Sequence, residues 1–296
     1  MAEHEAAYEG GTGTAVPPPE DRDPMAVLAL PDDLRFPGTP AEAEYEAYFR
    51  IGRARPEPGL WTRALLRTQS AFLADLPATG LGDRERADLL AGFVLLGHTA
   101  LAAAPPPAGL ADEEEPQLPP PPGGLPPLGR WRLGHQIFHL LLALMNSLLD
   151  EAIRAAEAAE WRRVTPLVDR LRLLYDAATA AMSYAADFGD DPLGAYRSEV
   201  RPTMEPPFVS PGFSGTFNRE HRETTRLLRQ LRRALKAAAP DDHELRTAAD
   251  ALRAAQSRNR ANHLLICERC VPEGVSLLRE HLTAQRPPHP PTPPDA

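Results

Sequence analysis

Residues 130–160 read RWRLGHQIFHLLLALMNSLLDEAIRAAEAAE, and this stretch has the clearest periodicity in the chain. Its apolar side chains recur at intervals of three and four residues, which places them on one face of an α-helix. They are Ile137, Leu140, Leu141, Leu144, Met145, Leu148 and Leu149. The spacing predicts one long amphipathic helix from about Arg130 to Glu160.

The segments on either side of this stretch also have helical patterns. We expect further helices at Ala41–Arg53, Leu60–Leu76, Asp83–Ala103, Val164–Phe188, Asn218–Ala239, Asp241–Cys270 and Pro272–Thr283. Asp83 precedes an apolar run and suits an N-cap, and Pro166 suits the first turn of a helix. No stretch alternates with period two over the length of a strand, and β-branched residues are sparse. The sequence therefore predicts an all-α fold.

Proline is unusually abundant, at 34 of 296 residues. Much of it lies in residues 1–25, 105–127 and 286–296, where it prevents regular structure and where few apolar side chains are present to form a core. We therefore expect a disordered N-terminal tail (1–25) and a disordered C-terminal tail (286–296). Between them we expect one helical domain (26–285) that contains a proline-rich surface loop (105–127).

Composition excludes several classes of protein. A formal net charge of -9 argues against binding nucleic acid through bulk electrostatics. The two cysteines, three residues apart, exclude a disulfide-stapled secreted scaffold. The N-terminus is acidic and has no apolar core of a signal peptide. The longest apolar run, Leu89–Ala104, is shorter than the ~20 residues of a membrane span, so we expect a buried core helix there and a soluble cytoplasmic protein.

A cluster of potential ligands lies near the end of the helix expected at 241–270. His263, Cys267 and Cys270 are spaced i, i+4, i+7, so they share one helix face. They fit half of a zinc site, or a Cys-x-x-Cys redox pair outside its usual βαβ context. They also fit haem ligation by His263 with Cys267 one turn later, the reverse of the order in the Cys-x-x-Cys-His attachment motif. A histidine beside two small apolar cysteines, with no ligand, is the remaining interpretation.

Two other segments carry histidines in informative places. His135 and His139 are one turn apart near the start of the long helix, but no Glu-x-x-His di-iron motif accompanies them. Residues 201–221 lie between two helices, are rich in proline and glycine, and end at His221. This stretch also holds Phe208, Phe213 and Phe217. Aromatic side chains on such a constrained loop indicate a rigid loop that lines a pocket.

Together these segments resemble the haem-dependent aromatic oxygenases, which include tryptophan dioxygenases and histidine-ligated haem tyrosine hydroxylases. The resemblance covers roughly Leu128 to Leu282. Its blocks are Gly134-His135-Gln136, then Arg201 with Pro211-Gly-Phe-Ser-Gly215 and Asn218-Arg-Glu-His221, then Arg258-Asn-Arg-Ala-Asn-His263 with Glu268-Arg269 and Gly274-Val-Ser-Leu-Leu278. Where tryptophan dioxygenases continue His-Gln with Glu-Leu-Trp-Phe-Lys, this chain has Ile137-Phe-His-Leu-Leu, which favours the tyrosine-hydroxylating branch.

The 3-methyl-tyrosine hydroxylases of that branch have a His…His-x-x-x-Cys pattern, and His221…His263-Leu-Leu-Ile-Cys267 is similar to it. The resemblance implies a tryptophan-dioxygenase-like helical bundle around a haem. His263 would be the proximal ligand of the haem iron, and His221 would be the candidate second axial ligand. Cys267 would attach the haem through a thioether, with Cys270 as the other candidate.

The resemblance also implies a reaction, the hydroxylation of L-tyrosine or a tyrosine derivative ortho to the phenol to give a catechol. His135 would exchange protons as the catalytic distal residue, at an ordinary pKa near ~6.5. Arg201 would pair with the substrate carboxylate, and Phe213 would contact the aromatic ring. The oxidant would be hydrogen peroxide or dioxygen, and a homodimer would be in keeping with the superfamily. An indole or tryptophan-type haem dioxygenase and a non-catalytic haem-binding or haem-sensing protein remain as alternatives.

Overall fold

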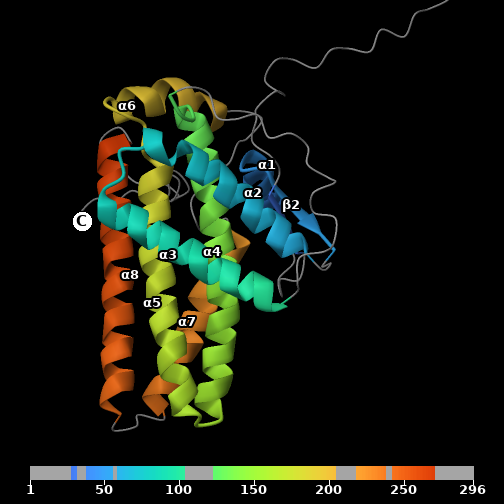
Figure 1. Cartoon of the computed structure of the whole chain (residues 1–296), viewed down its shortest axis with the longest axis vertical. Coiled ribbons are helices and arrows are strands. Elements are labelled where there is room, and N and C mark those ends of the chain that lie inside the picture. The colour runs from blue at the N-terminus through green and yellow to red at the C-terminus, as the bar shows by residue number, and fades with distance from the viewer. Residues whose placement is uncertain are drawn as a thin grey trace, which may run out of the picture.

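A computed structural model of the chain describes residues 28–31, 38–55, 59–103, 123–204, 218–237 and 242–270. Over these residues the fold is all-α, as predicted (Figure 1). Its helices are α1 (Pro40–Tyr48), α2 (Leu60–Asp75), α3 (Asp83–Ala103), α4 (Pro127–Glu157), α5 (Trp161–Ala185), α6 (Pro192–Ala195), α7 (Arg219–Ala237) and α8 (His243–Cys270). Short 3-10 or π-helical turns follow α2 and α6, and they are η2 (Leu76–Ala78), η3 (Tyr196–Val200) and η4 (Arg201–Met204).

The long helices form a bundle with α5 at its centre. α5 packs against α3, α4 and α8, while α7 packs against α4; α3 crosses the bundle obliquely (Figure 1). The apolar face predicted in residues 130–160 is the core, since Ile137, Leu140 and Leu149 are fully buried. A Cβ at Gly134 would lie 2.4 Å from the Cβ of Ala185, so the glycine permits the close approach of α4 to α5.

The N-terminal part differs from the prediction. The helix expected over Ala41–Arg53 ends at Tyr48, because Arg50 adopts a left-handed backbone conformation (φ 54°) that a helix cannot continue through. The chain then forms strand β2 (Ile51–Ala54), which pairs in parallel with β1 (Leu28–Pro31). The expectation of no strand was therefore wrong for these two short segments.

The other described helices lie within a few residues of their expected positions. α4 begins at Pro127, earlier than expected and inside the loop assigned to 105–127. The helix expected at Pro272–Thr283, both tails and residues 105–122 of that loop lie outside the described residues. The 205–217 part of the aromatic loop lies outside them as well.

Among the described residues, α4 is the helix long and apolar enough to cross a membrane. Some 67% of the most apolar 18-residue stretch of α4 is buried inside the protein, which is typical of a bundle helix that contributes one face to the core. The run Leu89–Ala104, expected to be a buried core helix, lies in α3 up to Ala103. Leu89 and Phe93 are buried there while Val94 is 59% exposed, so α3 is amphipathic and only one of its faces joins the core.

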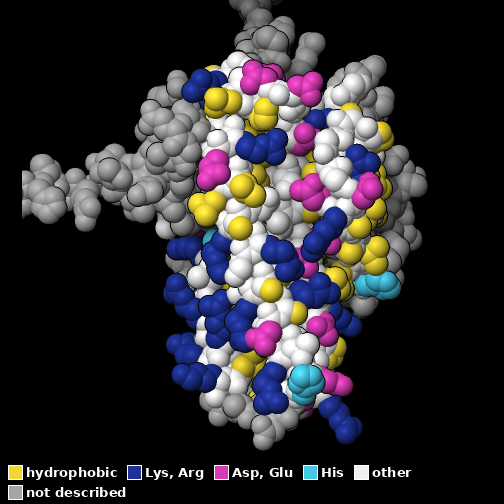
Figure 2. Space-filling model, turned by 90° about the vertical axis from the view of Figure 1, so that its left-hand side faces the viewer, with side chains coloured by type: hydrophobic (Ala, Val, Ile, Leu, Met, Phe, Trp, Pro, Cys, Tyr) yellow, Lys and Arg dark blue, Asp and Glu magenta, His cyan; other side chains and the backbone are white. Residues whose placement is uncertain are grey.

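Charge is unevenly spread over the surface. Figure 2 shows many lysine and arginine side chains on the face that α8 contributes to, and a hydrogen bond from Arg232 Nη2 to Gln256 Oε1 (2.6 Å) joins α7 to α8 there. The exposed basic residues of these two helices include Arg229, Arg232, Arg233, Lys236, Arg246, Arg253 and Arg260. The net charge of -9 therefore coexists with a basic face.

A buried ion pair holds the start of α4. Asp75 is fully buried, and its carboxylate accepts hydrogen bonds from Arg130 Nε (2.9 Å), from the Tyr184 hydroxyl (2.8 Å) and from the backbone N–H of Leu125 (2.6 Å). Burial and the neighbouring Asp75 charge raise the pKa of Tyr184 well above its usual value, so the phenol stays protonated and donates. Four segments of the chain therefore meet at one carboxylate.

We expect Asp75→Asn to lower the free energy of unfolding by about 3 kcal/mol, because the buried Arg130 charge would keep only the more distant carboxylate of Asp187, at 3.5 Å, as a counter-ion. Urea denaturation would measure the change, with the exposed Asp190→Asn as the matched control. A change no larger than that of the control would show that the pair contributes nothing to stability.

Candidate functional site

The last turns of α8 are held on α5 by two asparagines. Asn259 Nδ2 donates to Thr179 Oγ1 (3.0 Å), and Asn262 Nδ2 donates to the carbonyl oxygen of Thr179 and to Ser183 Oγ (both 3.1 Å). Successive residues of an α-helix are rotated by about 100°. His263 follows the inward-facing Asn262, so it lies at the side of this contact and is exposed.

His263 and Cys267 meet one turn apart. Cys267 Sγ lies 3.8 Å from His263 Nδ1, which realises the spacing seen in the sequence. Although His263 is exposed overall, partial burial of its imidazole lowers the pKa, and this favours the neutral form, which is the form that binds a metal ion. The site therefore presents a nitrogen ligand with a thiol beside it.

Both cysteines are buried and free of disulfides. Burial raises the pKa of the Cys267 thiol, and it raises the pKa of Cys270 to about 11. Thiols of this kind are protonated at neutral pH, unlike redox-active or zinc-binding thiolates. Within the described residues no group of three or more His, Cys, Asp or Glu side chains has the arrangement of a metal site. The zinc and redox interpretations gain no support from this part of the chain.

His135 lies in an aromatic cluster on α4. Its ring stacks on Phe49 (centroids 3.9 Å apart, planes at 14°) and packs on Trp131 (4.2 Å). His135 Nδ1 is 2.7 Å from the carbonyl oxygen of Trp131. A carbonyl only accepts, so Nδ1 carries the proton and Nε2 keeps the lone pair.

Burial lowers the pKa of His135 to about 3, and the nearby His139 and His263 oppose protonation further. The ordinary pKa expected from the sequence is therefore wrong, because the aromatic cluster removes the water that would solvate an imidazolium. At neutral pH His135 is a neutral hydrogen-bond acceptor. A positive charge on His263, near the end of α8, would lower the pKa of His135, near the start of α4, further.

We expect this buried neutral histidine to make the folded protein less stable in acid. In the unfolded chain His135 takes up a proton near pH 6.5, but in the folded chain it does so only near pH 3. The part of the folding stability that depends on a neutral His135 is therefore fully present above pH 6.5 and is lost as the pH falls toward 3. Between pH 6.5 and about 4, wild type should lose about 3 kcal/mol more stability than His135→Phe. Urea titrations at several pH values would measure this, and the exposed His98→Gln should behave as wild type. Parallel pH profiles for wild type and His135→Phe would refute the assignment.

Arg201 begins η4 and is exposed beside the buried Tyr196. Burial raises the pKa of Tyr196, the charge of Arg201 lowers it, and Cys270 and Cys267 raise it. Arg201 and the two cysteines are therefore all near enough to Tyr196 to influence its pKa. The short helix α6, which leads into this turn, contacts α8 (Figure 1).

His221 lies in the first turn of α7. Its backbone N–H donates to Asn218 Oδ1 (2.9 Å), and its ring lies 6.5 Å from the ring of Phe138 on α4. The structure thus brings His135, His263, Cys267 and Arg201 toward one end of the bundle and sets His221 against α4. Phe213, expected to contact the substrate ring, lies outside the described residues.

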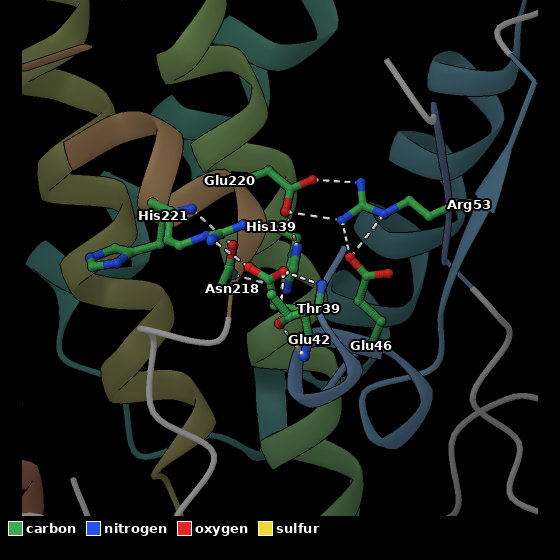
Figure 3. Close-up of polar contacts among 9 residues, drawn as sticks. Thr39, Glu42, Glu46, Arg53, His139, Asn218, Glu220 and His221 are labelled. Carbon is green, nitrogen blue, oxygen red and sulfur yellow. Dashed lines mark hydrogen bonds and ion pairs between the residues drawn. The ribbon is translucent and has the colours of Figure 1, made fainter. Parts of the chain in front are cut away.

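The structure also contains a buried polar cluster that the sequence did not reveal (Figure 3). His139 is fully buried, with Nδ1 3.0 Å from Glu220 Oε2 and Nε2 2.9 Å from Asn218 Nδ2. Glu220 Oε1 pairs with Arg53 Nη1 at 2.6 Å. Burial opposes the Glu220 carboxylate, but His139 and Arg53 outweigh it and hold its pKa well below the usual value.

The sequence contains only a weak signal for this cluster. Glu220 stands in a run of charged residues at the start of a helix, a pattern typical of the surface, yet it is only 1% exposed. His139 was notable as a histidine on an apolar helical face. Its partner Arg53 comes from a strand that local pattern did not predict.

Comparison with known proteins gives one match. Residues 2–262 match the family model described as SfmD 3-methyl-L-tyrosine peroxygenase. No curated protein and no solved structure matches the chain. The match includes His135, Arg201 and His221 and ends one residue before His263, so it is independent of the histidine–cysteine pair. Because it covers nearly the whole described chain, this protein belongs to the SfmD 3-methyl-L-tyrosine peroxygenase family.

Proposed function

We propose that this protein is a haem-dependent peroxygenase that hydroxylates L-tyrosine or a tyrosine derivative, such as 3-methyl-L-tyrosine, ortho to the phenol. The product would be a catechol amino acid, and the oxidant hydrogen peroxide. The observation that carries the proposal is the pair of His263 Nδ1 and Cys267 Sγ, 3.8 Å apart on α8. Membership of a peroxygenase family supports it.

The donor set fits a haem held by one imidazole and one thioether. His263 offers a neutral imidazole at an exposed position, and Cys267 offers a protonated thiol one turn later. Addition of that S–H across a haem vinyl group forms the S–C bond and places the hydrogen on the other vinyl carbon. The haem would supply the activation of peroxide for oxygen transfer.

His221 is assigned to the haem as a second ligand as part of the proposal. A haem held by both His263 and His221 would be closed to peroxide, so His221 would have to move away before the reaction. Its place in the first turn of α7, at a helix terminus, suits such a movement.

The remaining site residues bind and orient. His135 Nε2 accepts a hydrogen bond from the substrate phenol or from peroxide, and it takes a proton only transiently because its pKa is about 3. Phe49 and Trp131 hold the ring in place and exclude water from it. Arg201 pairs with the amino-acid carboxylate through its planar guanidinium. Phe213 is proposed to contact the aromatic ring.

We expect Arg201→Met to raise KM for the amino acid about 30-fold, the cost of one charge-assisted hydrogen-bonded pair. The effect on kcat should be smaller, because Arg201 is assigned to binding rather than to the reacting atoms. Arg197→Met, an exposed arginine four residues earlier, is the matched control. Equal KM values in the two variants would remove Arg201 from the substrate site.

The proposed function is tested by a visible spectrum of the full chain expressed with a supply of haem, then by acid–acetone extraction. A Soret band whose haem stays with the protein supports a covalent haem. A Soret band with extractable haem contradicts the thioether, and absence of haem contradicts the proposal. Haem without turnover of any tyrosine derivative or tryptophan would indicate a haem-binding protein, and turnover of tryptophan alone an indole-type dioxygenase.

A further inference from the structure

We propose that His139 is a positioning residue for His221. Through Asn218 it would fix the first turn of α7, and thereby the direction in which the His221 imidazole is presented. The link between His139 and α7 stands on contacts alone; only the consequence at the iron rests on the proposed function. Nothing in the proposed chemistry requires His139 to touch substrate or haem.

The hydrogen bonds of Asn218 fix the proton positions in the cluster. Asn218 Oδ1 accepts from the His221 backbone N–H (2.9 Å), the bond expected of an N-cap residue at the start of a helix. Its Nδ2 therefore faces His139 Nε2, 2.9 Å away. An amide NH₂ only donates, so His139 Nε2 is the acceptor and His139 Nδ1–H donates to Glu220 Oε2 (3.0 Å).

Glu220 ties the same turn to the N-terminal part of the chain. Its carboxylate accepts from Arg53 Nη1 (2.6 Å) and Nη2 (3.2 Å) of β2, and Arg53 also pairs with Glu46 of α1. Asn146 Nδ2 of α4 donates to the backbone carbonyl oxygen of Glu220 at 3.1 Å. These contacts are almost fully shielded from water, so misplacing any of the charged groups is costly.

The inward bonds of Asn218 and Glu220 determine the direction of the His221 side chain. Asn218 and Glu220 both turn inward to His139, and His221 follows Glu220 by about 100° around the helix. Figure 3 shows the His221 imidazole on the opposite side from the cluster. If the inward bond from Asn218 to His139 is lost, the first turn of α7 gains freedom and the His221 ring is no longer held in one direction. Loss of the bond from His139 to Glu220 matters less, because Arg53 still holds the Glu220 carboxylate.

The test uses two variants of His139, each of which keeps one of the two hydrogen bonds that its imidazole makes. Gln places an acceptor near the position of Nε2, so His139→Gln keeps the bond to Asn218. Asn reaches only the position of Nδ1, so His139→Asn keeps the bond to Glu220. Mass spectrometry of the haem-free full chain would measure the rate of amide hydrogen exchange of residues 218–224. This rate should rise about 10-fold in His139→Asn, as expected if the lost hydrogen bond from Asn218 is worth as much as a helix cap. It should stay near the wild-type rate in His139→Gln, and peptides from α5 and α8 should not change in either variant.

A second variant keeps the test decisive if His139→Asn does not fold. Ser caps a helix as well as Asn does but cannot reach His139. Asn218→Ser therefore keeps the helix cap and removes the hydrogen bond to His139. Faster exchange of residues 218–224 in Asn218→Ser supports the proposal. Wild-type exchange there shows that the cap alone fixes the turn and overturns the proposal.

The haem-loaded chain supplies the second readout. A second axial imidazole keeps ferric haem low-spin, so His139→Asn should show a larger high-spin fraction in the visible spectrum, approaching that of His221→Ala. Faster exchange with an unchanged spectrum would overturn the connection from His139 to His221 at the iron. If no haem binds at all, the proposed function fails, while the exchange result still decides whether His139 positions α7.

Discussion

Replacement of His263 by Ala is expected to reduce kcat/KM for a tyrosine substrate at least about 100-fold. Even residues that only support a metal ligand cost about 10–100-fold when they are removed, and His263 is assigned to the iron itself. The exposed His243→Ala, at the start of the same helix, is the matched control and should retain wild-type activity. Steady-state kinetics on haem-loaded protein would measure both variants.

Rescue distinguishes ligation from a structural role of His263. Added imidazole should bind in the space left by His263→Gly and restore part of the activity and the Soret position of the wild type. Asn259 and Asn262 would still hold α8 on α5 in this variant, so the helix should keep its place. Wild-type activity in His263→Ala, or a loss that accompanies unfolding without rescue, would contradict the assignment.

Cys267→Ser is expected to abolish covalent attachment of the haem, whereas Cys270→Ser should leave it intact. Cys267 Sγ lies beside the His263 imidazole at 3.8 Å, while Cys270 follows His263 by seven residues, about 10.5 Å along the helix axis. A haem whose iron is bound by His263 has its edge within reach of the nearer thiol. Intact-mass spectrometry of the denatured chains would show the haem mass in Cys270→Ser and its absence in Cys267→Ser. The reverse result would assign the thioether to Cys270.

Much of the bundle was predictable because local periodicity and burial agree along α4. The seven apolar positions counted there are all within the buried core. The proximity of His263 and Cys267 was also predictable from their i, i+4 spacing, because a continuous helix sets that relation without contacts from the rest of the chain.

The features that escaped prediction depend on distant contacts. β2 forms because it pairs with β1 and because Arg50 ends α1, and no local pattern specifies either event. Glu220 is buried because Arg53 and His139 reach it from two other elements. The low pKa of His135 likewise depends on Phe49, which lies far from it in sequence.

The most direct test of the account is the fate of oxygen from labelled peroxide. Haem-loaded full-length protein would be mixed with 3-methyl-L-tyrosine and hydrogen peroxide that carries ¹⁸O, and the product analysed by mass spectrometry. A haem-dependent peroxygenase is expected to form a catechol amino acid that carries one labelled oxygen, and to form it only when haem is present. An unlabelled product, or no product from a haem-loaded protein with any tyrosine derivative, would contradict it.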